Sequence, residues 1–201
     1  TRSLNIPRNL KNAVKFISEA PQQPIDVGQV TYRDENGQPA HRYFLNIADF
    51  GLGGEVVREV NRSRLERRAS SYILCLINTM RTFKGHQVEL SVDGLKAGSG
   101  NYLIGAIANG RIFGKGLKIA PRARLNDSLF DLILVKGLTF LEFCLHGWKL
   151  VNGSHLNYHK VTWRRGQKIE VSAPGEEQVL IEVDGEQVGS LPATFNLIPA
   201  S

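Results

Sequence analysis

The chain has 201 residues, of which 42% are hydrophobic, so it is long and apolar enough for one large packed domain or two small ones. No apolar run approaches the roughly 18 residues of a membrane-spanning helix. The two cysteines, Cys75 and Cys144, form no CxxC pair, so neither a zinc knuckle nor a disulfide framework is indicated and a reducing, cytoplasmic compartment is expected. A formal net charge of +6 favours anionic partners such as nucleic acid, phosphate or acidic lipid headgroups.

The first part of the chain predicts helices around a strand hairpin. Apolar residues recur at helical spacing over residues 8–19, and strand-like alternation follows at 25–32 and 41–48, with Asn36-Gly37 as a tight turn between the two strands. Helical patterns at 56–60 and 72–80 flank a polar loop at 61–68. This loop carries an arginine cluster, interpreted as a solvated face able to touch anionic lipid: Arg62, Arg64, Arg67 and Arg68.

The rest of the chain is dominated by predicted strands, with one helix at 140–150. The strand patterns cover residues 88–92, 103–108, 129–135, 161–163, 169–171, 179–183 and 195–197. We therefore predict a mainly β (α+β) chain, folded as an antiparallel β-sandwich or flattened barrel that carries a few short helices.

The segment Val183-Asp184-Gly185-Glu186 is the first candidate for chemistry. The alternation before it makes Asp184-Gly185 a tight hairpin turn and puts Glu186 at the start of the next strand. Two carboxylates at one sheet edge are able to hold a metal ion or take a proton from an attacking hydroxyl. Asp-Gly turns are common, and Asp93-Gly94 is a second one in this chain, so spacing alone favours a plain turn.

Two further loops and a histidine pair are weaker candidates. The glycine-rich connector 109–116 allows close backbone approach to a phosphate, but it lacks P-loop spacing and equally suits a plain strand connection. The segment 123–129 offers the Asp127 side chain and free carbonyls to Mg²⁺ or Ca²⁺, with a capped Asx turn as the alternative. His155 and His159 have no third ligand nearby in the sequence and are interpreted as surface residues.

Taken in order, several segments resemble the C-terminal half of the bacterial diacylglycerol-kinase and sphingosine-kinase-like lipid kinases, over nearly the whole chain. The segments are Ser3-Leu4-Asn5-Ile6-Pro7, Ile25-Asp26-Val27-Gly28, Phe44-Leu45-Asn46-Ile47-Ala48 through Gly51-Leu52-Gly53, Asn109-Gly110-Arg111 through Ile119-Ala120-Pro121, Leu125-Asn126-Asp127 and Asp184-Gly185-Glu186. The resemblance implies that residues 1–24 are a linker and helix from an N-terminal nucleotide-binding domain, and that 25–201 are the C-terminal substrate-side β-sandwich. The fragment alone is expected to be inactive.

The resemblance also implies site residues and cofactors. Glu186 matches the family's proposed general base for the lipid hydroxyl, with Asp184 beside it in the turn. Asp127 matches a ligand of Mg²⁺, together with the backbone carbonyls of Arg124 and Leu129. ATP is the implied phosphoryl donor and is held mainly by the other domain. The chain departs from the family pattern at Ser128, where glycine is usual, and at Lys115, where a run of glycines is usual.

Two other functions remain open at this stage. NAD kinases share the two-domain plan, although the Asp-Gly-Glu turn and the Asn-Gly-x-x-x-Gly connector look more like the lipid branch. A non-catalytic module whose basic face binds anionic membrane or nucleic acid would also suit the charge. Under the lipid-kinase interpretation the partners are a lipid substrate, ATP and the surface of an anionic membrane. Nucleic acid is not expected in that case, and a homodimer is allowed.

Overall fold

The computed structural model describes residues 3–4, 6–7, 9–62, 69–114, 116–175 and 178–200, with the backbone alone at 61–62 and 69–74. Of the predicted arginine cluster, Arg64, Arg67 and Arg68 lie outside the described residues, and Arg62 is described only by its backbone. Lys115, where the chain departs from the family pattern, also lies outside them.

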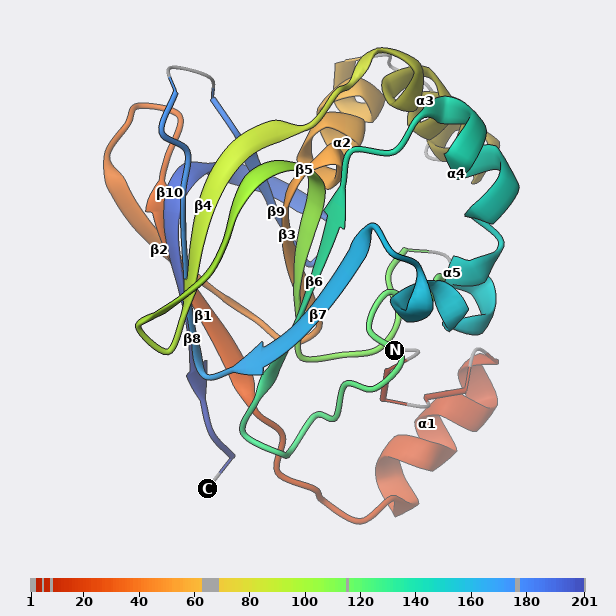
Figure 1. The fold of residues 1–201 in the computed structure, drawn as a ribbon. Coiled ribbons are helices and arrows are strands. Elements are labelled where there is room, and N and C mark those ends of the chain that lie inside the picture. The colour runs from red at the N-terminus through yellow and green to blue at the C-terminus, as the bar shows by residue number, and fades with distance from the viewer. Residues whose placement is uncertain are drawn as a thin grey trace.

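The described residues form one antiparallel β-barrel with helices on one side of it (Figure 1). The strands are β1 (Val27–Arg33), β2 (Pro39–Phe44), β3 (Ile47–Gly51), β4 (His86–Val92), β5 (Leu95–Ala108), β6 (Phe130–Lys136), β7 (Val161–Gly166), β8 (Lys168–Ser172), β9 (Leu180–Val183) and β10 (Glu186–Ile198). A ring of strands closes in the order β10, β8, β4, β5, β3 and β9, because β9 pairs with β10 again. The prediction of a mainly β, antiparallel fold is therefore confirmed.

Two long strands make this closure possible. The first part of β5 pairs with β4, and its second part pairs with both β3 and β6. The first part of β10 pairs with β9, and its second part pairs with β1 and β8. Each long strand therefore runs from one part of the barrel wall to another, and the hairpin β1–β2 and the antiparallel pair β6–β7 extend the wall beyond the ring.

The barrel interior is filled by aromatic and branched side chains. Phe44 and Phe130 stack with their ring centroids 5.5 Å apart. Glycine lies directly opposite two of the core phenylalanines, Gly28 opposite Phe44 and Gly105 opposite Phe50. A Cβ at either glycine would lie only 2.1–2.2 Å from the phenylalanine ring, so these rings need the space that glycine leaves.

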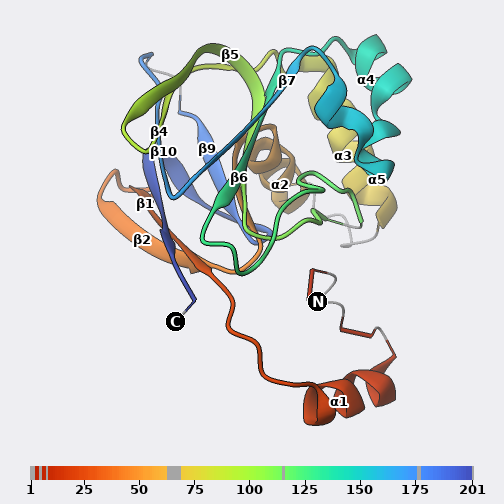
Figure 2. The same ribbon diagram turned by 60° about the horizontal axis from the view of Figure 1, so that its bottom comes forward.

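The helices are α1 (Leu10–Glu19), α2 (Leu52–Arg62), α3 (Ala69–Thr82), α4 (Phe140–His146) and α5 (Lys149–Asn152), with a 3₁₀ turn at Ser154–Asn157. Helix α2 packs on β3 and β9 and against α3. Helix α1 has no buried residue, and Figures 1 and 2 show it standing apart from the barrel. No helix among the described residues is long and apolar enough to cross a membrane.

Two local predictions need correction. The strand predicted at 41–48 is two strands, because the backbone leaves the ladder at Leu45 and Asn46 before β3 begins. His155, interpreted as a surface residue, is buried, and its Nε2 lies 2.9 Å from the carbonyl oxygen of Ile119. Burial lowers the pKa of His155, so the ring is a neutral part of the packing behind α5.

Candidate functional site

The acidic turn between β9 and β10 has the predicted hairpin geometry. Asp184 and Gly185 both have positive φ, 48° and 96°, as a two-residue type I′ turn requires, and Val183 pairs with Glu186 across it. The Asp184 carboxylate accepts hydrogen bonds from three consecutive backbone N–H groups, those of Leu45, Asn46 and Ile47, at 2.9, 3.1 and 2.9 Å. These bonds replace ladder bonds and explain why the predicted strand 41–48 is interrupted there. Asp184 therefore fixes the turn to the β2–β3 corner.

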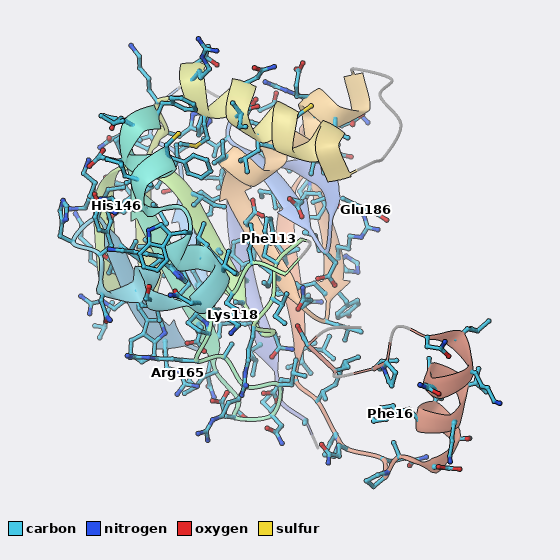
Figure 3. All side chains as sticks on the ribbon, turned by 90° about the vertical axis from the view of Figure 1, so that its right-hand side faces the viewer. Phe16, Phe113, Lys118, His146, Arg165 and Glu186 are labelled. Atoms are coloured by element: carbon cyan, nitrogen blue, oxygen red, sulfur yellow. The ribbon has the colours of Figure 1, made fainter. Side chains whose placement is uncertain are left out.

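Glu186 keeps an accessible carboxylate on this fixed turn. Its side chain is 66% exposed, and Oε2 lies 2.5 Å from Nη2 of Arg42 on β2. Figure 3 shows Glu186 projecting from the barrel on the side away from Arg165. An exposed carboxylate on a braced turn is able to accept a proton from a ligand that reaches this edge, with the neighbouring guanidinium beside it.

A second pair of acids lies behind the turn, and the sequence interpretation missed it. Asp49 on β3 is directly opposite Glu182 on β9, and both side chains are buried. Apart from each other, the Asp49 oxygens and Glu182 Oε2 have no hydrogen-bond partner within the described part of the chain. Burial raises the pKa of Asp49 well above its ordinary value and raises the pKa of Glu182 to about 7.

The location of these acids explains why alternation alone did not reveal them. On β9, Ile181 and Val183 point into the barrel core, so Glu182 occupies the outward position that normally faces water. Helix α2 covers that face, and a Cβ at Gly53 in its first turn would lie only 2.1 Å from Asp49 Oδ1. Glu182 is buried because a helix packs on this face of the sheet, and the sequence of the strand alone does not reveal that helix.

Backbone and amide hydrogen bonds link the β2–β3 corner to the glycine-rich connector. The Asn46 carbonyl accepts from the N–H groups of both Asn109 and Gly110, at 2.9 and 2.8 Å. The Asn109 side chain then donates to the carbonyls of Leu45 and Asp26, at 3.0 and 2.7 Å. The connector is thus held against the same corner that carries the acidic turn.

Buried Asp26 continues this polar network to the segment that contains Asp127. Its carboxylate accepts from the N–H groups of Ser128 and Ala200, both at 2.8 Å, and its own N–H donates to the Leu125 carbonyl at 2.6 Å. The segments 25–26, 44–47, 109–110, 125–128 and 184–186, all selected from the sequence, are therefore joined by one set of hydrogen bonds. Asp127 and Glu186 are linked through it and make no direct contact in the hydrogen bonds described.

The turn at Asp127 has oxygen donors suited to a hard cation. Asp127 Oδ1 is buried and lacks a hydrogen-bond partner among the described residues, while Oδ2 makes a close ion pair with Arg165. A carboxylate oxygen together with backbone carbonyls is the donor set that Mg²⁺ takes, so the residues present fit such an ion. Ser128 has φ of 58°, which explains why glycine suits this position and why serine there is strained.

Beside this turn lies a cavity of about 470 Å³. It is lined by Arg111, Pro121, Arg122, Arg124, Trp163 and Arg165. The buried carboxylate of Asp131 accepts from Nε1 of Trp163 at 2.5 Å and lies 3.6 Å from Nε of Arg165. Burial raises the pKa of Asp131, and the Trp163 hydrogen bond and the nearby Arg165 oppose this effect.

The strands close into an antiparallel barrel that carries the Asp-Gly-Glu turn at one edge, and this architecture is that of a β-sandwich-like domain. Residues 46–201 match the family model described as the YegS C-terminal NAD kinase beta sandwich-like domain, and the chain belongs to this family. Among the related proteins, the chain is 29% identical over 197 residues to a diacylglycerol kinase of Bacillus subtilis. It is 25% identical over 202 residues to a Pectobacterium atrosepticum protein named "Probable lipid kinase YegS-like".

The matches span most of this chain and only part of each relative. The chain is covered to 96% and 99%, and the two relatives to 61% and 62%. A solved diacylglycerol kinase structure from Bacillus anthracis superposes with a TM-score of 0.65 at 20% identity, covering 99% of this chain and 59% of that one. This structural likeness concerns the fold, and it confirms the architecture described above.

Proposed function

We propose that this chain is the substrate-side domain of an ATP-dependent lipid kinase, which transfers the γ-phosphoryl group of ATP to a lipid hydroxyl such as that of diacylglycerol. Membership of the YegS C-terminal family and the names of the relatives support a kinase. The observation that carries the proposal is the braced turn, in which Asp184 is fixed by three hydrogen bonds and Glu186 remains exposed.

In this proposal Glu186 accepts the proton of the lipid alcohol as the oxygen attacks the phosphoryl group in line, and Asp184 positions the turn. Phosphoryl transfer depends mainly on positioning and on neutralising charge, so the role assigned to Glu186 is that of proton acceptor alone. Arg42 Nη2 lies 2.5 Å from Glu186 Oε2 and orients the carboxylate at this edge. ATP binds mainly to the other domain, which residues 1–24 are proposed to join to this one.

Mg²⁺ is proposed to bind at Asp127 with the carbonyls of Arg124 and Leu129. When bound, it would neutralise negative charge near the site. The chain's own contribution is the buried Asp127 Oδ1 together with the Ser128 N–H bond to Asp26, which sets the shape of this turn.

A peripheral contact with anionic membrane is part of the proposal, because the lipid substrate resides there. Three apolar side chains follow one another at helical spacing along α4 and the residue that precedes α5, and they are 67%, 58% and 59% exposed: Leu141, Leu145 and Trp148. Lys149 follows Trp148, with its Nζ 5.2 Å from the Tyr158 ring centroid, and the backbone of Lys118 is held next to α5 by its N–H bond to the Leu150 carbonyl at 2.7 Å. Exposed apolar and tryptophan side chains flanked by lysines suit the interface of an anionic bilayer.

The test is phosphoryl transfer by the full-length protein from labelled ATP to diacylglycerol in detergent micelles. Glu186→Gln is expected to lower kcat by at least roughly a hundredfold, as loss of a general base does, and to leave the fold intact. Glu89→Gln, an exposed acid on β4, is the matched control and should retain full activity. A fully active Glu186→Gln enzyme rules out the base, and labelling of NAD in place of lipid would favour the NAD-kinase alternative.

A further inference from the structure

The arginine cavity beside the Asp127 turn has no role in the proton transfer proposed above. Its arginines come from two parts of the chain that meet only in the fold. Arg111, Arg122 and Arg124 belong to the long connection between β5 and β6, and Arg165 belongs to β7. Figure 3 shows Arg165 well away from Glu186, so the cavity that Arg165 lines lies in a different part of the molecule from the acidic turn.

The guanidinium groups are oriented by the protein itself. Arg111 donates from Nε to the Ala123 carbonyl at 2.7 Å, and Arg122 lies 4.7 Å from the centroid of the Trp163 ring. Arg165 is held by its ion pair with Asp127. Three of the four side chains are therefore already ordered, which reduces the entropy that a ligand would otherwise lose in fixing them.

The charges at the cavity are not balanced. Four guanidinium groups line it, and among the described residues the carboxylates near them are Asp127 and Asp131. Both form ion pairs with Arg165, and Asp131 also attracts Arg122 at longer range, so two negative charges face four positive ones. The close contacts described for Arg111 and Arg122 are with a carbonyl and an aromatic ring, neither of which carries a net charge. Bringing several positive charges together in this way is unfavourable unless an anion joins them.

We propose that this cavity binds a phosphate group that carries at least two negative charges. Guanidinium groups form paired hydrogen bonds with phosphate oxygens, and several of them around one hollow select a multivalent anion over chloride. A cavity of about 470 Å³ leaves room for the organic part of a phosphate ester. The ligand is therefore a phosphomonoester or pyrophosphate, carried either by a soluble molecule or by a lipid headgroup. The proposal does not depend on the lipid-kinase function.

Trp163 offers a local reporter, because Arg122 lies over its ring. In a Trp148→Phe background, Trp163 is the tryptophan left in this 201-residue chain. Titrating the full-length protein with inorganic pyrophosphate at constant ionic strength should change the tryptophan fluorescence with saturation, and Trp163→Phe should abolish this change. The Arg122→Gln/Arg124→Gln variant should bind on the order of tenfold or more weakly, because it removes two of the four guanidinium groups that line the cavity. Calorimetry of both proteins supplies a readout that does not depend on fluorescence.

Arg164→Gln is the matched control. Arg164 is exposed on the same strand next to Arg165 and does not line the cavity, so its loss removes one positive charge without touching the site. Pyrophosphate affinity should be unchanged in this variant. Equal weakening by Arg164→Gln, or unchanged affinity in the Arg122→Gln/Arg124→Gln variant with its circular dichroism intact, overturns the proposal.

Two further probes separate the sources of the phosphate. Glycerol 3-phosphate tests a soluble phosphomonoester, and vesicles of phosphatidylcholine with phosphatidic acid test a lipid headgroup. Saturable binding of either one that depends on Arg122 and Arg124 supports the site and assigns its source. A response to potassium chloride equal to that to pyrophosphate at matched ionic strength, or no response to any phosphate probe, overturns it.

Discussion

Asp49 on β3 and Glu182 on β9 form a directly opposed pair of buried carboxyl groups beneath the first turn of α2. The pKa of Glu182 rises from 4.5 to about 7, with burial as the largest cause, and the pKa of Asp49 is also raised. Two such groups so close together favour a state in which a proton is shared between them. The pair therefore makes the stability of the domain sensitive to pH near neutrality.

The direction of the pKa shift of Glu182 decides how the free energy of unfolding changes with pH. Because the folded pKa of Glu182 lies above its unfolded value, the folded state holds more protons between pH 4.5 and about 7, and the free energy of unfolding falls as the pH rises through this window. Glu182→Gln should flatten this slope and stabilise the protein at pH 8 by roughly 1–3 kcal/mol, because its amide is able to donate to Asp49. Urea unfolding at a series of pH values measures both effects.

Glu186→Gln is the control for this series. Glu186 is exposed, and the substitution removes one glutamate carboxylate, as Glu182→Gln does. Its pH slope should match that of the wild type. A Glu182→Gln variant that keeps the full slope, or that is less stable than the wild type at pH 8, would contradict the assignment of the pair.

The hydrogen bonds of Asp184 predict a separate effect on stability. Asp184→Ala leaves the N–H groups of Leu45, Asn46 and Ile47 without their acceptor and also places alanine at a φ of 48°. We expect a loss of about 2–3 kcal/mol in the free energy of unfolding. Asp184→Asn tolerates the same backbone conformation and keeps one acceptor oxygen, so its loss should be smaller. Equal stability of Asp184→Ala and the wild type in urea unfolding would show that these bonds contribute little.

The local parts of the fold were accessible from the sequence. The turn at Asp184-Gly185 follows from two neighbouring residues that tolerate positive φ, and the same logic located Asp93-Gly94. A turn is also present at Asn36-Gly37, where Gly37 alone has positive φ. The break at Leu45 and Asn46 was not predicted, because its cause is a carboxylate about 140 positions away in the chain. Local patterns contain no information about such a partner.

In the candidate site, the individual segments were also predictable from the sequence, but their spatial arrangement was not. The acidic turn, the connector and the Asp127 segment were selected individually, but their connection through Asp26 and Asn109 depends on how the strands pair. The arginine cavity depends on the antiparallel pairing of β6 with β7. This pairing brings Arg165 beside the β5–β6 connection, which lies about 40 residues earlier in the sequence. The net charge of +6 indicated an anionic partner but did not locate its binding site.

The left-handed backbone at Ser128 predicts a stabilising substitution. Serine is strained at φ of 58°, so Ser128→Gly should raise the free energy of unfolding by about 0.5–1 kcal/mol while the N–H bond to Asp26 is kept. Ser172→Gly on β8 is the matched control, because glycine in a strand should cost about 0.5–1 kcal/mol. Destabilisation by both substitutions in urea unfolding would show that the Ser128 side chain contributes more than its backbone strain costs.

The apolar surface of α4 and α5 predicts a contribution to membrane binding. Trp148→Ala removes the largest exposed apolar side chain of this surface, and we expect roughly tenfold weaker binding of the full-length protein to vesicles that contain an anionic phospholipid. Vesicle sedimentation measures this change. Added salt should weaken binding by the wild type as well, because Lys149 directly follows Trp148 and the chain has a formal net charge of +6.

Leu95→Ala is the matched control for the membrane experiment. Leu95 is 75% exposed and lies at the β4–β5 turn, outside α4 and α5, so its removal reduces exposed apolar area without changing the proposed surface. Vesicle affinity should stay at the wild-type value in this variant. If Leu95→Ala weakens binding as much as Trp148→Ala, the contact depends on general hydrophobicity. If neither substitution weakens binding, the membrane contacts another face of the protein and the apolar surface of α4 and α5 has a different role.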